Sequence, residues 1–269
     1  MRTNRVAVAL KMALGFFLAV LLLHAQQRPQ LNDGEPHGDP PFLVEDGWKP
    51  LLNGKDLSGW RAQGGEKHEW FTTRGVRWER LLGPTHLAAI PEPGGRIVNG
   101  NGRTANLVSD EKLGDVELYL EFMLSRGSNS GVYVQGLYEV QVFDSFGSEF
   151  AMKSSDGGGI YHRWINDQAV GGSPPKVNAS RRPGEWQSYQ IWFQAPRFDA
   201  SGKKTANAKF IRVLYNGQLV QQNVEVEGGT RAHMPLEEGP QGPLMLQGDH
   251  GPVAYKNIYW RPLRPIVNR

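Results

Sequence analysis

The residues best suited to chemistry lie on a short segment, 138–144, that alternates like a β-strand. Glu139 and Gln141 share one face and Val140 and Val142 share the other, because side chains along a strand alternate between its two faces. The valines predict a buried face. The opposite face is then either solvated surface or the floor of a polar groove. On a groove floor, the Glu139 carboxyl is placed for general acid or base chemistry, a common way to cut sugars.

His250 is the second candidate for proton transfer. It stands between glycines in Gln247-Gly248-Asp249-His250-Gly251, and glycine lets the backbone bring one histidine close to a ligand. Its unperturbed pKa of about 6.5 suits a base near neutral pH. Asp249 is expected to point elsewhere if the segment is extended, although it can still orient the loop. A loop histidine without a role is the open alternative.

Further polar residues flank these two. Asp144 is expected on the valine face, where it either caps a turn before Ser145 or sits at the groove rim. Asn129 and Ser130 offer amide and hydroxyl groups to a sugar or an oxyanion, and Gln247 offers an amide. Short polar residues before a glycine are also ordinary turn residues, so both interpretations stay open at Asn129 and Ser130.

Aromatic and possible metal-binding residues occupy the long segment 144–182. Tyr161, with His162 and Trp164, is expected to form a wall on which a sugar ring stacks. His162, Asp167 and His250 are candidate metal ligands, but no two of them show a recognised ligand spacing. We therefore predict no cofactor, and a divalent metal stays open. Loops this long in a compact domain are usually functional.

The elements that must position these residues are short strands. No long stretch shows a helical period, and the chain carries 33 Gly and 18 Pro, which favours an all-β sandwich or barrel. Asn216-Gly217 predicts a tight hairpin turn, since a type I′ turn needs positive φ at both central residues. Besides 129–135 and 138–144, strands are predicted at 115–122, 188–193, 209–215 and 254–260.

The N-terminus predicts export. The apolar run at 12–23 is short for a membrane span, and it follows a basic region that contains Arg2, Arg5 and Lys11. Ala25 offers a small residue for cleavage. We expect a signal peptide at 1–25, a disordered tether at 26–45 and one domain at 46–265, with no membrane span after cleavage. The protein would be secreted or periplasmic; an uncleaved anchor is the alternative.

Charge and cysteine content exclude several classes of function. Loss of 1–25 takes the basic residues from 30 to 27, equal to the 27 acidic ones, so a nucleic-acid partner is not expected. With no cysteine, the chain has no disulfide framework and no cysteine-based catalysis. The sequence leaves the oligomeric state unknown.

The motifs together resemble the 3-keto-disaccharide hydrolase domain family, over roughly 48–263. They stand in the family's order at 51–60 (LLNGKDLSGW), 129–133, 138–144, 159–161, 184–186 and 247–251. The resemblance implies a concanavalin A-like jelly-roll sandwich of two antiparallel sheets. It also implies an oxidised saccharide as substrate, with a ketone at carbon 3, and cleavage of its glycosidic bond by hydrolysis or β-elimination.

Such a substrate sets the chemistry. The ketone acidifies the hydrogen on carbon 2, and the leaving oxygen on carbon 1 is β to the forming carbanion. Cleavage needs a base at carbon 2, donors for the enolate oxygen and an acid for the leaving oxygen. Glu139, His250 and Asp144 are the predicted catalytic residues. Asn129, Ser130, Gln141, Tyr161 and Gln247 are the predicted substrate contacts.

Two alternatives remain at this stage. A non-catalytic, lectin-like sugar-binding module would use the same fold and groove. A conventional retaining glycosidase needs two carboxylates about 5–5.5 Å apart, and Gln141 stands where the second would be expected.

Overall fold

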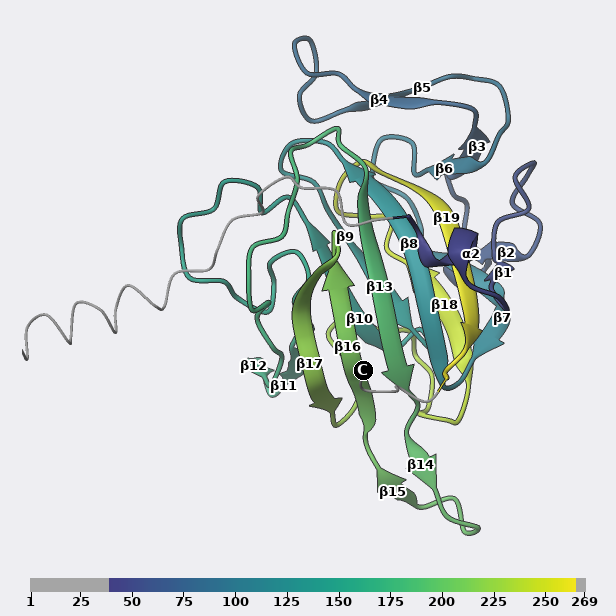
Figure 1. Cartoon of the computed structure of the whole chain (residues 1–269), viewed down its shortest axis with the longest axis vertical. Coiled ribbons are helices and arrows are strands. Elements are labelled where there is room, and N and C mark those ends of the chain that lie inside the picture. Colours follow the sequence, from purple (N-terminus) through teal and green to yellow (C-terminus); the bar gives the residue numbers. More distant parts are fainter. Residues whose placement is uncertain (1–38, 265–269) are drawn as a thin grey trace, which may run out of the picture.

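The computed structural model describes residues 39–264, which form two antiparallel sheets packed face to face (Figure 1). Within these residues the larger sheet has eight strands and the smaller has five. The larger runs β17 (Gln218–Val226), β16 (Ala208–Tyr215), β13 (Gln187–Gln194), β8 (Val116–Leu124), β19 (Val253–Pro262), β6 (Arg96–Val98) and β3 (Phe71–Thr73), and β1 (Lys49–Pro50) also pairs with β19. The smaller runs β10 (Tyr138–Phe143), β9 (Asn129–Val134), β18 (Gly242–Leu246), β7 (Leu107–Leu113) and β2 (Trp60–Ala62). The predicted all-β jelly-roll sandwich is thus confirmed.

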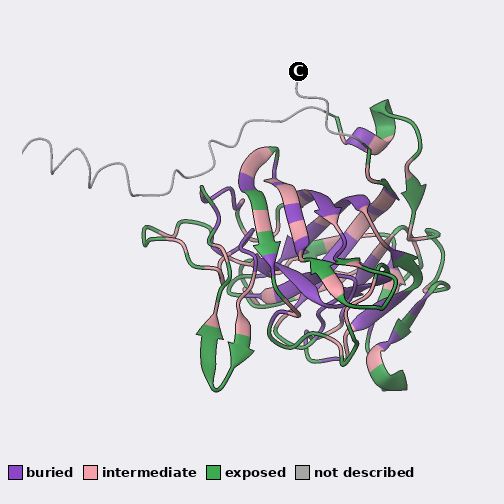
Figure 2. Cartoon of the chain, turned by 90° about the horizontal axis from the view of Figure 1, so that it is seen from below, coloured by how far each residue is buried: buried purple, intermediate pink, exposed green. Residues whose placement is uncertain are grey.

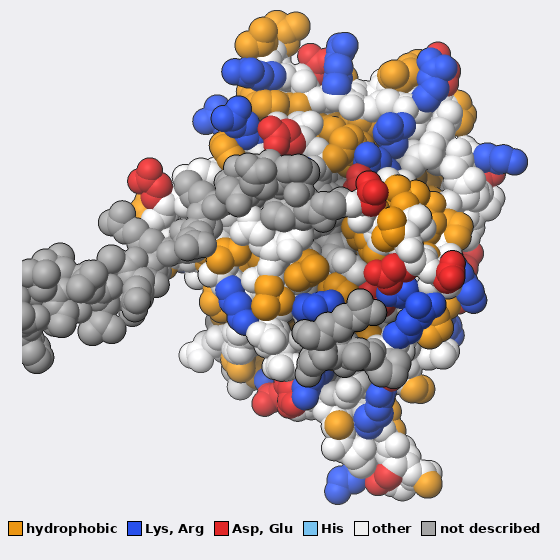
Figure 3. All heavy atoms as spheres, in the orientation of Figure 1, with side chains coloured by type: hydrophobic (Ala, Val, Ile, Leu, Met, Phe, Trp, Pro, Cys, Tyr) orange, Lys and Arg blue, Asp and Glu red, His pale blue; other side chains and the backbone are white. Residues whose placement is uncertain are grey.

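Small elements complete the fold. The ribbon of β4 (Val76–Trp78) and β5 (Leu87–Ala89) and that of β14 (Arg197–Phe198) and β15 (Lys204–Ala206) project from opposite ends (Figure 1). A third ribbon joins β11 (Arg163–Ile165) to β12 (Gln168–Val170), and the helical pieces are α2 (Pro41–Val44) and a 3₁₀ turn at Gln63–Gly65. Hydrophobic side chains lie at the end where the β4–β5 ribbon projects (Figure 3), and Leu81 and Leu82 of that ribbon are exposed.

The core fills the space between the sheets. Leu118, Leu120 and Phe122 of β8 face it from one side, as the alternation at 115–122 predicts, and Val140 and Val142 of β10 face it from the other. Figure 2 shows the buried residues gathered along the strands of the two sheets. Burial of this apolar surface is the main stabilising contribution, at about 25 cal/mol per Å².

The predicted hairpin turn and strands are present. Asn216 and Gly217 have φ of 49° and 80°, and Tyr215 pairs with Gln218 across the turn. These positive angles are those of a type I′ turn, which matches the twist of the flanking strands. The segments predicted at 188–193, 209–215 and 254–260 lie within β13, β16 and β19.

The N-terminal expectation is wrong at one boundary. Residues 41–44 form α2, and Phe42 stacks on Tyr259 of β19 with ring centroids 4.1 Å apart. Glu45 forms an ion pair with Arg261, with 2.5 Å between the carboxylate oxygen and the guanidinium nitrogen. These contacts hold 42–45 on the larger sheet, so the predicted tether is too long at its C-terminal end. The rest of the tether and the predicted signal peptide lie outside the described residues. No helix within 39–264 has the length and apolar character needed to span a membrane.

Candidate active site

Glu139 and Gln141 project from the outer face of the five-stranded sheet, away from the core. The strand prediction for this face is confirmed, because Tyr138, Val140 and Val142 are the core residues of β10. Glu139 pairs with Tyr133 of β9, and Gln141 with Gly131. The two outward side chains of β10 therefore lie beside the outward side chains of β9.

Glu139 lies at the edge of its sheet and not on a central strand. β10 is the terminal strand of its sheet, and its free edge is covered by the loop that follows it. Tyr161 donates its backbone N–H to the Glu139 carbonyl at 3.1 Å, and Gln141 donates its own to the Gly159 carbonyl at 2.8 Å. This pairing brings Tyr161 to the Glu139 face and satisfies an edge that would otherwise expose its hydrogen-bonding groups.

A cavity of about 350 Å³ lies over this face. That volume is at the lower end of the range for small-molecule sites. Six of the eight residues predicted for the site line it together, and they come from separate parts of the chain. Its lining consists of Asn129, Tyr133, Glu139, Gln141, Tyr161, Arg231, Ala232, Gln247 and His250.

Glu139 is the buried carboxyl of this cavity. Its side chain packs over Gly131, where a Cβ atom would come within 2.9 Å of the Glu139 carboxyl carbon. Burial raises the pKa of Glu139 to about 8; a hydrogen bond with Tyr133 opposes the shift, and the charge of Asp249 adds to it. Glu139 therefore carries a proton at neutral pH and can donate it.

His250 and Asp249 form a contacting pair. The Asp249 carboxylate lies 2.5 Å from His250 Nδ1, so Asp249 does not point away as it would in an extended segment. The cause is the backbone, which is not extended at 249–251. An ionised carboxylate can only accept, so it holds the proton on Nδ1 and leaves Nε2 with a lone pair. That is the state a general base needs, and both side chains are about half-exposed to solvent.

Three amide side chains supply polar groups that the protein leaves unpaired. Within residues 39–264, the side-chain oxygens of Asn129, Gln141 and Gln247 are buried and have no hydrogen-bond partner. A buried polar group without a partner is costly and rare. All three residues line the same cavity, so their oxygens mark positions where a ligand can bind.

Arg231 and Tyr133 belong to the site but were not predicted. The Tyr133 hydroxyl donates to the Arg231 carbonyl at 3.1 Å, and the Arg231 guanidinium lies 4.1 Å from the Trp164 ring centroid. Thr230 secures this segment, because its hydroxyl accepts from the Glu139 N–H at 3.1 Å. Ala232 follows with φ of 62°, a strained conformation of the kind found at functional sites. No local pattern in 229–234 signals this placement.

Tyr161 forms a wall of the cavity, together with the residues predicted beside it. Its ring stacks on His162, with centroids 4.3 Å apart. Burial raises the pKa of Tyr161, and the charge of Glu139 raises it further, while Arg231 opposes. Burial lowers the pKa of His162, with Arg231 again adding a positive charge nearby. His162 is therefore neutral at pH 7 and offers an aromatic face rather than a charge.

Two predicted residues lie outside the cavity. Ser130 faces the core, where its hydroxyl donates to the Gln247 carbonyl and contacts the Tyr255 hydroxyl, each at 2.7 Å. Its prediction as a substrate contact is wrong, because alternation places it opposite Asn129. Asp144 accepts the Gly127 N–H at 2.8 Å, which secures the turn before β9, and a backbone hydrogen bond with Phe146 places it at the predicted turn as well. Burial raises its pKa, and the structure does not bring it to Glu139.

The candidate metal ligands do not converge. Within residues 39–264, no three His, Asp or Glu side chains lie close enough together to hold a metal ion, and this includes His162, Asp167 and His250.

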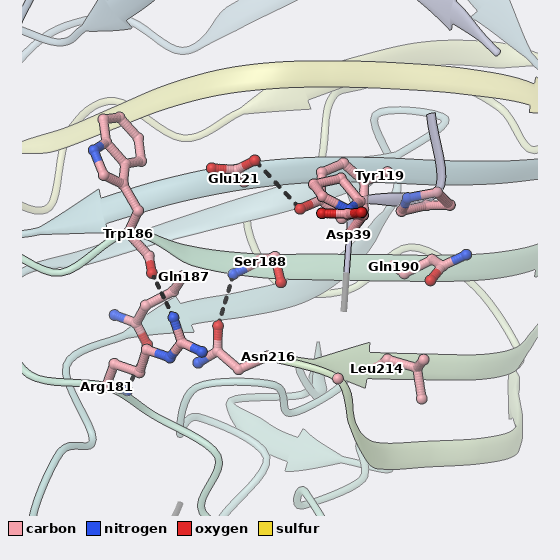
Figure 4. Close-up of a pocket in the computed structure, with 13 residues that line it drawn as sticks. Asp39, Tyr119, Glu121, Arg181, Trp186, Gln187, Ser188, Gln190, Leu214 and Asn216 are labelled. Atoms are coloured by element: carbon pink, nitrogen blue, oxygen red, sulfur yellow. Dashed lines mark hydrogen bonds between the residues drawn. The ribbon is translucent and has the colours of Figure 1, made fainter. Parts of the chain in front are cut away.

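A larger hollow, of about 560 Å³, lies on the outer face of the eight-stranded sheet (Figure 4). Its polar groups are bonded to one another: Tyr119 donates to Glu121 at 3.3 Å, and the Ser188 N–H donates to Asn216 at 2.9 Å. Burial raises the pKa of Tyr119 well beyond the range in which it ionises in water. This hollow therefore lacks the unpaired groups and the proton donor of the Glu139 cavity, which we take as the candidate active site.

A family comparison agrees with this geometry. Residues 47–261 match the sequence model of the 3-keto-alpha-glucoside-1,2-lyase-like domain. The chain belongs to this family. The resemblance inferred from the motifs is thereby confirmed, and the match includes every residue that lines the cavity. No curated protein matches the chain.

Solved structures share the fold. A protein from Parabacteroides distasonis, provisionally described as a glycosyl hydrolase, is 27% identical, with a TM-score of 0.59 over 81% of this chain and 84% of that one. A second protein of that description and organism is 19% identical, with a TM-score of 0.51 over 80% and 99%. At that identity the second likeness concerns the fold alone.

Proposed function

We propose that the protein is a carbohydrate-active enzyme that cleaves the glycosidic bond of glycosides carrying a ketone at carbon 3. Family membership and the 27% identical structure support a glycoside-acting enzyme. The observation that carries the finer proposal is one buried, protonated carboxyl facing the same cavity as a carboxylate-oriented imidazole. Acid and base are the two groups that elimination next to a ketone requires.

The reaction follows from these positions. His250 Nε2 takes the proton from carbon 2, and the electrons of that bond form the double bond between carbons 1 and 2. The bond from carbon 1 to the glycosidic oxygen breaks, and the leaving oxygen takes the Glu139 proton. The products are the free aglycone and an unsaturated 3-keto sugar; addition of water to the double bond then gives the hydrolysis product.

The ketone oxygen gains negative charge as the proton leaves carbon 2. Arg231 supplies a positive charge at the cavity, and the side-chain NH2 group of Asn129 supplies a donor. The unpaired oxygens of Gln141 and Gln247 accept hydrogen bonds from sugar hydroxyls instead. One fixed donor at such an oxyanion typically contributes roughly 3 kcal/mol to transition-state stabilisation. Fixed donors of this kind need no reorganisation when the charge develops.

Conventional two-carboxylate glycosidase chemistry fits less well. Among the described residues that line the cavity, Glu139 is the sole carboxylic acid. Asp249 is engaged with His250, and it lines a neighbouring hollow rather than this cavity. A retaining glycosidase needs a second carboxylate about 5–5.5 Å from the first, facing the same sugar.

The proposal is tested by following aglycone release from a 3-keto-glucoside and from the same glucoside without the ketone. We expect cleavage of the oxidised compound alone, and a loss of about 10²–10⁴-fold in His250→Ala. Full activity in His250→Ala, or equal cleavage of both compounds, would refute the assignment. Saturable sugar binding without release would favour the lectin-like alternative.

A further inference from the structure

A second cavity, of about 330 Å³, adjoins the one that holds Glu139. Asn129, Gln141 and Tyr161 line both cavities, so the two share a wall. A substrate whose reacting carbons lie at Glu139 can therefore extend past these three residues into the second space.

One wall of the second cavity is apolar and aromatic. Phe143 ends β10, and Phe150 and Ala151 come from the loop that follows. Phe150 is 81% exposed, so it gains little from packing within the fold. A large apolar side chain exposed at the mouth of a cavity is typical of a binding surface.

Two polar side chains of the second cavity, those of Gln141 and Asp156, are bonded to the loop that follows β10. Asp156 accepts the Lys153 N–H at 2.7 Å, and Gln141 donates its amide to the Ser155 carbonyl at 3.2 Å. Among the described residues of this cavity, the side-chain oxygens of Asn129 and Gln141 are left buried and unpaired, and both residues belong to the wall shared with the first cavity. A second sugar would bring several hydroxyl groups that each need a partner. A flat apolar ring needs only the aromatic wall.

We propose that this second cavity is a leaving-group subsite that binds an aromatic aglycone, such as the ring of a phenol, against Phe150 and Phe143. The inference rests on the proposed function, because it places the cleaved bond between the two cavities. It makes the enzyme selective for aryl 3-keto-glucosides over alkyl ones. Phe150 is then a specificity-determining residue outside the acid–base machinery.

The test measures binding and turnover separately. Binding of methyl, phenyl and glucosyl 3-keto-glucosides is measured by calorimetry on Glu139→Gln protein, in which chemistry is slowed. The same titrations are repeated after adding Phe150→Ala or Phe146→Ala to that background. Phe146 is the matched control, since it is a half-exposed phenylalanine of the same loop that lies near Arg182 and lines neither cavity.

We expect the phenyl compound to bind about tenfold more tightly than the methyl one. Phe150→Ala should remove most of this preference, and Phe146→Ala should keep it. The subsite is overturned if phenyl and methyl bind equally, if the preference survives Phe150→Ala, or if the glucosyl compound binds most tightly. Turnover of the methyl compound by the unmodified protein tests the proposed function independently. A preference for phenyl without turnover would refute the proposed function but support the aromatic binding site. Turnover without that preference would support the proposed function and refute the site.

Discussion

Glu139→Gln is expected to stabilise the fold near neutral pH while it removes turnover. The reason is the pKa of the buried carboxyl, which rises from 4.5 in the unfolded chain to about 8 in the native cavity. The native state holds the proton over a pH range in which the unfolded state has lost it. Folding near neutral pH must therefore take up a proton, and this uptake costs free energy.

The magnitude and sign follow from that pKa. Below pH 4.5 both states are protonated, and this residue costs no stability. From pH 4.5 to about 8 the free energy of unfolding falls by about 1.4 kcal/mol per pH unit, which amounts to about 3 kcal/mol at pH 7. Glutamine has nearly the same shape and does not titrate, so it avoids this cost. For a domain of this size, the gain corresponds to a rise of roughly 6–12 °C in Tm.

The assay is denaturant unfolding of both proteins from pH 4 to pH 8, with turnover measured on the same samples. The stability difference should be near zero at pH 4 and grow to about 3 kcal/mol at pH 7, while turnover falls by about 10²–10⁴-fold. A stability difference that does not vary with pH would refute the raised pKa. Unchanged turnover would remove Glu139 from the reaction.

Two further substitutions probe the positions of the acid and the base. Gly131→Ala places a Cβ within 2.9 Å of both the Glu139 carboxyl carbon and the Tyr133 ring. It should displace the carboxyl and lower kcat at least about tenfold, with an unchanged circular dichroism spectrum. Gly95→Ala, whose Cβ meets no atom within 4 Å, is the control and should leave kcat unchanged; equal activity in the two variants would contradict the close packing at Gly131. Asp249→Asn replaces a carboxylate, which can only accept from His250 Nδ1, by an amide that can also donate to it, and it removes a charge that raises the Glu139 pKa. We therefore expect kcat to fall roughly tenfold and the alkaline limb of the pH–rate profile to move to lower pH. Asp110→Asn, at an exposed carboxylate of β7 that pairs with Arg61, is the matched control, and an unmoved limb in Asp249→Asn would contradict the coupling.

The sequence was sufficient for features that depend on local alternation. Glu139 and Gln141 face away from the core because Val140 and Val142 must face it, and the pattern of period two already contains that information. The same holds for the turn at Asn216-Gly217. The prediction is wrong at Ser130 because neighbouring side chains of a strand face opposite sides: Asn129 faces the cavity, so Ser130 faces the core although it is polar.

Features that depend on distant pairing could not be read from local patterns. Thr230 and Arg231 reach the site through hydrogen bonds to Glu139 and Tyr133, about a hundred residues earlier in the chain. The position of β10 at the end of its sheet depends on which strand pairs with β18, and no alternation encodes that choice. The contact between Asp249 and His250 depends on a non-extended backbone that the glycines permit but do not specify.

The central claim is that this cavity removes a proton from carbon 2 of a 3-keto sugar. The most direct measurement is a proton NMR time course of the protein with a 3-keto-glucoside in deuterated buffer, beside the same sugar without protein to correct for spontaneous exchange. We expect release of the aglycone together with an unsaturated 3-keto sugar or with deuterium at carbon 2 of the product, since water addition to the double bond also places deuterium there. Enzymatic release of the aglycone with hydrogen retained at carbon 2 and no unsaturated intermediate would contradict the account.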